Sequence, residues 1–252
     1  MTPSRLVDLR FDGPLALLRL DDGRVNALGR PLLESLAQAL DEAESARVLV
    51  ISGRETVFGA GLDLPALLPL GREALRDFFS LFDRVFDRLL AYPRPIITAA
   101  RGAAVAGGAI LLCAGDERLV TPHGKAGINV AALGLSLPGS ALEITRAALG
   151  DRGLFEAATT ARLYEGPERI RIGFATEVVD PELIDARARE LALVRAQLDP
   201  DAVAKVREQV RRPAVARLAA FGPKDAESIL DRWFAPATQE RLQAAVARLK
   251  KS

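Results

Sequence analysis

The chain has 252 residues, a length that suits one large domain or a core with an appendage. Its 34 basic and 33 acidic side chains leave a formal net charge of +1. This near-zero charge excludes a strong positive electrostatic field over the whole protein that would attract nucleic acid or an anionic membrane. The chain has a single cysteine, which excludes a disulfide within the chain. It also has a single histidine, so we expect no metal site.

The sequence carries no hydrophobic targeting segment. No apolar run reaches the length of a membrane-spanning helix, and the first residues lack the apolar core of a signal peptide. We therefore expect a cytoplasmic protein that has neither nucleic acid nor a membrane as a partner.

The first predicted elements form a strand hairpin. Residues 6–11 alternate in polarity, residues 12–14 form a turn, and residues 15–20 form the second strand. A helix with an apolar period near 3.6 is predicted at 31–40, and a buried strand follows at 48–51.

The middle of the chain continues the alternation of helices and strands. A long amphipathic helix is predicted over 72–90, and its aromatic residues recur at helical spacing, which favours a core role over contact with a cofactor. A strand at 96–99, a helix at 107–114 and a strand at 118–120 come next. This alternation indicates an α/β fold.

The last part of the chain differs in composition. From about residue 181 it becomes charged, rich in alanine and mostly helical, with a final helix at 242–249. We therefore divide the chain into an α/β core at 1–180 and a C-terminal helical region at 181–252. Composition alone predicts only a helical cap for the second part.

Two predicted strands are each followed by a turn rich in glycine and alanine. One such turn spans residues 58–63, and the other spans residues 101–109. Small residues let another group approach the backbone closely, so backbone N–H groups can reach a ligand. The two turns together could supply two converging amide donors.

Five segments resemble motifs of one known family, in the family's order. The turn at 58–63 resembles F-S-A-G-A-D, and residues 94–108 resemble K-P-x-I-A-A-x-x-G-x-A-x-G-G-G. Residues 113–118 resemble C-D-x-R, residues 127–138 resemble G-x-P/N-E-x-x-x-G-x-x-P, and residues 173–179 resemble the end of A-x-x-x-G-L-V-x-x-V-V. Over nearly its whole length the chain therefore resembles the enoyl-CoA hydratase/isomerase family, or crotonase superfamily.

This resemblance implies a particular fold and assembly. The fold it implies is a crotonase-like spiral of ββα units with a C-terminal helical region. It also implies that residues 181–252 complete the subunit and form a trimer interface, which would give a homotrimer or a homohexamer.

The resemblance also implies the substrate. Family members bind acyl-CoA thioesters, so coenzyme A would be part of the substrate and no separate cofactor would be needed. They hold the thioester carbonyl between two backbone N–H groups, which stabilise the enolate that forms beside it. By position, these donors would be the amides of Ala60 and Gly107. The alternative is that these small residues only make tight turns.

The resemblance places the family's contacts with coenzyme A in two segments of this chain, residues 24–28 and residues 60–64. Arg24 is either a phosphate partner or a solvated surface charge, and Lys250 and Lys251 are further basic candidates. Asp63 directly precedes a short apolar stretch, so a helix N-cap is favoured over a catalytic role. The residues implied for coenzyme A binding are Arg24, Val25, Ala27, Ala60, Leu62, Asp63 and Leu64.

The chain departs from the family at the two catalytic positions. Typical hydratases carry one glutamate three residues after the oxyanion-hole glycine and another twenty residues later, where Ile110 and Val130 stand here. Gly127 and Gly134 flank Val130 at the family's spacing, so the register is secure. General acid–base help is worth roughly 10² to 10⁴ in rate per group. Standard hydration is therefore not expected, and neither is the 3,2-isomerisation, which keeps the second glutamate.

Three functions remain open from the sequence. The first is an enzyme with relocated acid–base machinery, for which Glu143 is the best-placed acid, although a structural or capping role explains it as well. His123 lies in a turn-like stretch and is expected at the surface. Weaker candidates for the relocated role are Asn129, Ser136, Ser140 and Tyr164.

The other two functions need no acid or base. A decarboxylase-type lyase forms its enolate by losing CO₂, so apolar walls would help it. A non-catalytic acyl-CoA binding or carrier protein would need only the contacts with coenzyme A. We favour an enzyme, a lyase or isomerase that acts on acyl-CoA, and the sequence alone does not separate it from a carrier.

Overall fold

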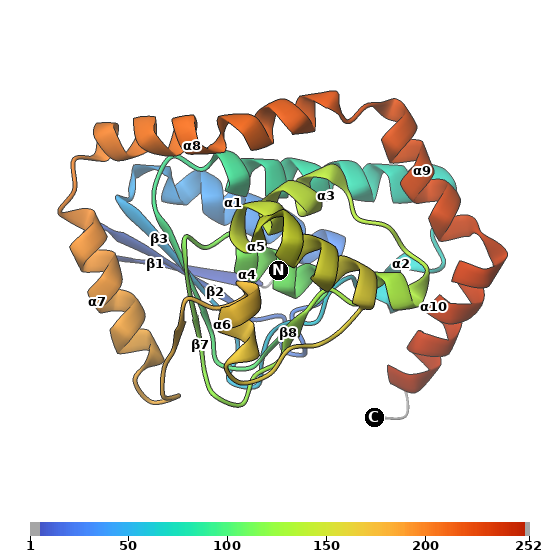
Figure 1. The fold of residues 1–252 in the computed structure, drawn as a ribbon, viewed down its shortest axis with the longest axis horizontal. Coiled ribbons are helices and arrows are strands. Elements are labelled where there is room, and N and C mark those ends of the chain that lie inside the picture. The colour runs from blue at the N-terminus through green and yellow to red at the C-terminus, as the bar shows by residue number, and fades with distance from the viewer. Residues whose placement is uncertain (1–5, 250–252) are drawn as a thin grey trace, which may run out of the picture.

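The computed structural model describes residues 6–249 and is built around a six-stranded sheet with the strand order β1-β2-β3-β5-β7-β9. The first two strands pair antiparallel as the predicted hairpin, and all other neighbours pair parallel, which confirms an α/β fold. Figure 1 shows the sheet enclosed by helices. Its strands are β1 (Val7–Asp12), β2 (Leu15–Leu20), β3 (Val48–Ser52), β5 (Ile96–Ala100), β7 (Glu117–Val120) and β9 (Glu177–Val178).

A second, three-stranded parallel sheet joins β4 (Val57–Gly59), β6 (Ala103–Val105) and β8 (Ala126–Gly127). Each of these short strands follows a strand of the large sheet, and each pair of strands is followed by a helical segment. The chain therefore winds through three successive ββα units. This is the spiral that the sequence predicted, although the three short strands themselves were not predicted.

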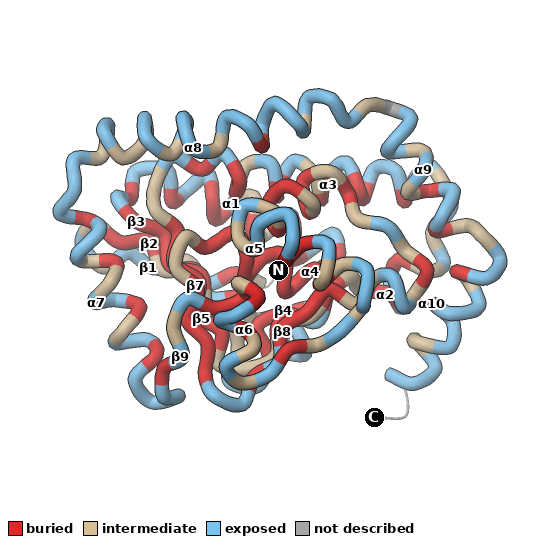
Figure 2. The backbone as a smooth tube through the Cα atoms, in the orientation of Figure 1, coloured by how far each residue is buried: buried red, intermediate tan, exposed pale blue. Residues whose placement is uncertain are grey.

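The helices of the first 180 residues pack around these sheets. Phe78, Phe82 and Phe86 are buried along one face of α3, as their helical spacing predicted. Figure 2 shows buried backbone concentrated in the strands and in α4, whose seven residues are all buried. The segments are α1 (Arg30–Glu42), η1 (Ala43–Ser45), α2 (Leu64–Leu67), α3 (Arg72–Ala91), α4 (Gly107–Cys113), η2 (Val130–Leu133), α5 (Gly139–Thr160) and α6 (Glu168–Ile172).

The C-terminal region is mostly helical, as predicted, and its last helix begins at Pro236, earlier than the predicted start at 242. Within residues 181–249 its helices are α7 (Ile184–Ala196), α8 (Pro200–Ala220), α9 (Pro223–Phe234) and α10 (Pro236–Leu249). Helix α7 buries an apolar face on the large sheet and so forms part of the core. Helices α8, α9 and α10 form an arm that packs on α3 and α5 and then reaches η2 and α2 (Figure 1). The boundary at residue 180 and the role in trimerisation stay predictions.

In the part of the chain that the structure describes, no helix combines the length and apolar character needed to cross a membrane.

Candidate active site

The two glycine-rich turns singled out in the sequence meet in the structure. A Cβ atom added to Gly59 would lie 2.9 Å from the Cα atom of Gly108, and one added to Gly108 would lie 2.7 Å from the Cα atom of Gly59. No side chain fits at either position. A Cβ atom on Gly61 would lie 3.5 Å from the amide nitrogen of Gly107. The backbones after β4 and β6 are therefore in direct contact.

Two backbone amides are left without acceptors at this contact. Ala106 has a positive φ of 50°, which turns the chain so that α4 begins at Gly107. The Ala106 amide donates to the Gly127 carbonyl at 2.8 Å. Within residues 6–249, the amides of Ala60 and Gly107 have no recorded backbone or side-chain acceptor. Both residues line the large cavity described next.

The cavity has a volume of about 910 Å³, which is ample for a small-molecule ligand. Its walls come from distant parts of the sequence: the loop at 22–29, the turn at 60–65, the start of α4, the η2 segment and the C-terminal arm. The cavity brings together all ten residues that the sequence implied for coenzyme A binding, for the two amide donors and for the two glutamate positions. These are Arg24, Val25, Ala27, Ala60, Leu62, Asp63, Leu64, Gly107, Ile110 and Val130.

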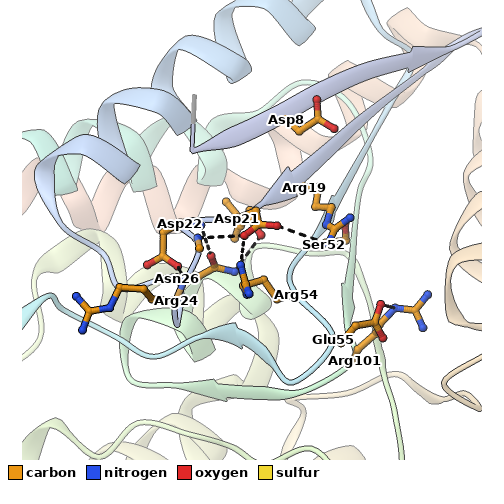
Figure 3. A network of polar contacts seen from close by, with 12 residues as sticks. Asp8, Arg19, Asp21, Asp22, Arg24, Asn26, Ser52, Arg54, Glu55 and Arg101 are labelled. Atoms are coloured by element: carbon orange, nitrogen blue, oxygen red, sulfur yellow. Dashed lines mark hydrogen bonds and ion pairs between the residues drawn. The ribbon is translucent and has the colours of Figure 1, made fainter. Parts of the chain in front are cut away.

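A buried asparagine that the sequence analysis missed fixes the loop at 22–29 (Figure 3). Asn26 is fully buried with a positive φ of 52°. Its Nδ2 donates to the carbonyls of Leu20 at 3.0 Å and Phe58 at 3.2 Å, and its Oδ1 accepts from the Asp22 amide at 3.0 Å. This side chain therefore ties the loop both to β2 and to the β4 strand that leads into the site.

The carboxylate of Asp22 completes the turn. It accepts hydrogen bonds from the amides of Arg24 at 2.7 Å and Ala27 at 3.1 Å. In Figure 3 the Arg24 side chain extends away from this network. No hydrogen bond or ion pair of its guanidinium is recorded in the described part of the chain. Arg24 therefore presents an unpaired positive charge at the cavity.

The second wall is joined to this loop by backbone hydrogen bonds. The Leu28 amide donates to the Gly61 carbonyl at 2.6 Å, and the Asp63 amide donates to the Leu28 carbonyl at 3.2 Å. The Asp63 side chain accepts from the Ala66 amide at 3.3 Å, which confirms that it caps α2.

The positions of the two family glutamates lie on the cavity wall and are apolar. Ile110 is buried on α4, and Val130 is half-buried at the start of η2. Among the described residues the only carboxylates that line the cavity are Asp22 and Asp63, and both accept backbone N–H groups. The surrounding wall is formed by Phe79, Phe82, Leu133, Leu135, Leu137 and Ile229.

Glu143, the relocated acid that the sequence offered as a candidate, does not line the cavity. Its side chain is completely buried and forms ion pairs with Arg146 and with Arg217, the latter at 2.7 Å. This pairing raises the pKa of Arg217. Glu143 therefore joins α5 to α8 and has the structural role that the sequence gave as its alternative.

The weaker candidates divide into two groups. Asn129 and Ser136 line the cavity, and no hydrogen bond of either side chain is recorded within the described residues. His123 is exposed in a turn, as predicted. Lys250 and Lys251 lie outside the described residues.

Ser140 and Tyr164 are buried outside the cavity. The Ser140 hydroxyl donates to Asp83 at 2.6 Å, and the Tyr164 hydroxyl donates to Glu156 at 3.2 Å. The pKa of the Asp83 carboxyl is raised, because the effect of burial exceeds the lowering by the hydrogen bonds from Ser140. Both hydroxyls are therefore engaged in links between helices or turns.

Comparison with known proteins identifies the family. The family model for enoyl-CoA hydratase/isomerase matches residues 10–237. A crystal structure of an enoyl-CoA hydratase from Mycobacterium marinum is 32% identical, with a TM-score of 0.81, over 88% of this chain and 98% of that chain. An enoyl-CoA hydratase from Mycobacterium ulcerans is 30% identical, with a TM-score of 0.83, over 90% of this chain and 99% of that chain.

The human mitochondrial delta3-delta2-enoyl-CoA isomerase has the same fold, with a TM-score of 0.92 and 23% identity over 98% of each chain. The chain belongs to the enoyl-CoA hydratase/isomerase family and has the crotonase fold.

Proposed function

We propose that the protein binds an acyl-CoA thioester and stabilises the enolate formed next to the thioester carbonyl. The observation that carries this proposal is the pair of amides at Ala60 and Gly107, which lack acceptors where the two turns meet. Fixed N–H donors aimed at a developing oxyanion lower an activation barrier by about 2.7–4 kcal/mol per donor. The thioester oxygen would take the place of the missing acceptor.

The coenzyme A moiety lies, in this proposal, between the loop at 22–29 and helix α2. Arg24 and Arg248 on α10 line the cavity, and neither guanidinium has a recorded partner within residues 6–249, so both suit phosphate groups. No separate cofactor is required, because coenzyme A enters as part of the substrate. Metal help is not proposed, since the described residues contain no group of three or more ligating side chains.

The reaction we propose differs from hydration. Adding water to a double bond needs groups that activate the water and deliver a proton, and neither Ile110 nor Val130 can do so. Decarboxylation is the candidate that an apolar wall favours. The bond between the α carbon and the carboxylate breaks, CO₂ leaves, and the electron pair passes to the thioester oxygen held by the two amides. Solvent then protonates the α carbon.

A non-catalytic acyl-CoA carrier is the second candidate. The ion pairs of Glu143 with Arg146 and Arg217 support it. They engage the acid that a relocated acid–base mechanism would need. Both candidates share the binding of the thioester and differ only in turnover.

We also propose that the protein forms a homotrimer or a homohexamer in the cytoplasm. Exposed apolar side chains support an assembly, since Phe155 on α5 and Val206 and Val210 on α8 are 72%, 56% and 69% exposed.

Titration calorimetry with coenzyme A and butyryl-CoA tests the binding, and assays of hydration, isomerisation and decarboxylation test the turnover. The variant Ala60→Pro removes one amide donor, whereas Ala60→Ser keeps it. We expect the proline variant to lose affinity for the thioester and the serine variant to retain it. Absence of thioester binding by the native protein would refute the proposal, and binding without turnover on any substrate would identify the carrier.

A further inference from the structure

One charged side chain stands at the end of the cavity wall that η2 forms. Gly134 ends η2, the segment that begins at Val130, and a Cβ atom added to Gly134 would lie 3.0 Å from Nη1 of Arg241. Arg241 lies on α10 and lines the cavity. Its guanidinium therefore rests against the far end of the wall that carries the apolar replacement of the second glutamate.

The Arg241 guanidinium is not among the donors to the nearby Gly134 carbonyl. The Gly134 carbonyl accepts from Arg232, whose Nη2 and Nε are at 2.9 and 3.2 Å, and from the Thr238 hydroxyl at 3.3 Å. Within residues 6–249 no hydrogen bond or ion pair is recorded for Arg241. Its neighbours on the arm, Arg232 and Thr238, therefore hold the wall in place, and none of these hydrogen bonds involves Arg241.

Within residues 6–249, no carboxylate is recorded as an ion-pair partner of Arg241. The two carboxylates that line it, Asp22 and Asp63, accept backbone amides in other segments. A guanidinium presents a planar fork of donors that matches a carboxylate. A purely aliphatic acyl chain would leave those donors to solvent, whereas a terminal carboxylate would satisfy them.

We propose that the cavity selects thioesters whose acyl chain ends in a carboxylate, with Arg241 as the residue that recognises it; this inference rests on the proposed function. A 3-10 helix rises about 2.0 Å per residue, so Gly134 lies about 8 Å along η2 from Val130. The recognised carboxylate therefore lies at the far end of the acyl chain and is not the group that decarboxylation removes from the α carbon. For the carrier, the ligand class is the monothioester of a short dicarboxylic acid. For the decarboxylase, the substrate would bear a second carboxylate on the α carbon of that acyl chain.

The test compares glutaryl-CoA with valeryl-CoA, which have five acyl carbons each and differ at the terminal group. Titration calorimetry with the native protein should show that glutaryl-CoA binds about tenfold more tightly than valeryl-CoA. This ratio corresponds to the low end of the usual strength of a hydrogen bond to a charged group, because Arg241 is exposed. In Arg241→Met the preference should disappear, with the affinity for valeryl-CoA unchanged. Arg212→Met, at an exposed position on α8, is the matched control and should keep the preference.

Equal affinity of the native protein for the two thioesters would overturn the inference and leave the proposed function standing. A uniform loss in Arg241→Met for coenzyme A, valeryl-CoA and glutaryl-CoA would also overturn it, because Arg241 would then contact the coenzyme. If the native protein bound no thioester at all, the proposed function would fail together with the inference. Thermal unfolding of each variant shows whether its fold is intact.

Discussion

Gly59 and Gly108 lie backbone against backbone, and a Cβ atom on either one would fall within 3 Å of the other's Cα atom. This contact joins β4 to the first turn of α4, and it brings the amides of Ala60 and Gly107 to one cavity. The geometry of the candidate site therefore depends on the absence of two side chains.

Substitution of Gly108 by alanine should distort this contact. We expect the free energy of unfolding to fall by about 1–3 kcal/mol, the usual cost of overpacking, and thioester binding to weaken at least tenfold. Urea unfolding and calorimetry measure the two effects. Gly71→Ser, at a helix N-cap with open space around it, should leave both quantities nearly unchanged. Full thioester affinity in Gly108→Ala would contradict the importance of the contact.

Replacement of Glu143 by glutamine should weaken the link between α5 and α8. Glu143 is completely buried, while Arg146 and Arg217 are partly exposed, so we expect a loss of about 1–3 kcal/mol, less than for a fully buried pair. Urea unfolding provides the measurement, and the exposed Glu182→Gln is the control. A variant of unchanged stability that has lost all turnover would instead mark Glu143 as catalytic.

The thiol of Cys113 should not react in the folded protein. Burial raises its pKa to about 12, so the thiol stays protonated at neutral pH and closed to solvent. A thiol reagent with a chromophoric leaving group should release one equivalent in denaturant and almost none from the native protein. Rapid labelling under native conditions would show that α4 opens readily.

Introducing glutamate at both family positions should create hydratase activity. The variant with Ile110→Glu and Val130→Glu supplies an acid and a base, each worth roughly 10² to 10⁴ in rate. The Val130 position is half-buried and tolerates a charge better than the buried Ile110 position. Absorbance assays with crotonyl-CoA compare the double variant with the native protein. A native turnover already typical of enzymes would contradict our account of the two apolar positions.

The sequence predicted the elements whose residues alternate or recur over a long window. Helix α3 carries a helical period, and β1, β2, β3, β5 and β7 of the large sheet were predicted from alternation or from apolar runs. The sixth strand of that sheet, β9, has two residues and was not predicted. The strands β4, β6 and β8 have only two or three residues, too few for a period, and were missed. Their pairing joins small residues that are distant in the sequence, such as Gly59 with Ala104 and Ala104 with Ala126.

The candidate site was predicted where it depends on local turns and missed where it depends on distant partners. The role of Asn26 comes from a hydrogen bond to Phe58, 32 residues away, and the role of Glu143 from Arg217, 74 residues away. No pattern in a single sequence identifies such pairs. The Asp-Asp-Gly-Arg stretch at 21–24 was the available signal for a turn there.

The most direct measurement of the central proposal is the infrared stretching frequency of the thioester carbonyl in butyryl-CoA labelled with ¹³C at that carbon. If the amides of Ala60 and Gly107 donate to this oxygen, the frequency should fall on binding to the native protein and to Ala60→Ser, and fall less with Ala60→Pro. A bound thioester whose carbonyl frequency equals that of the free compound would contradict the two-amide site.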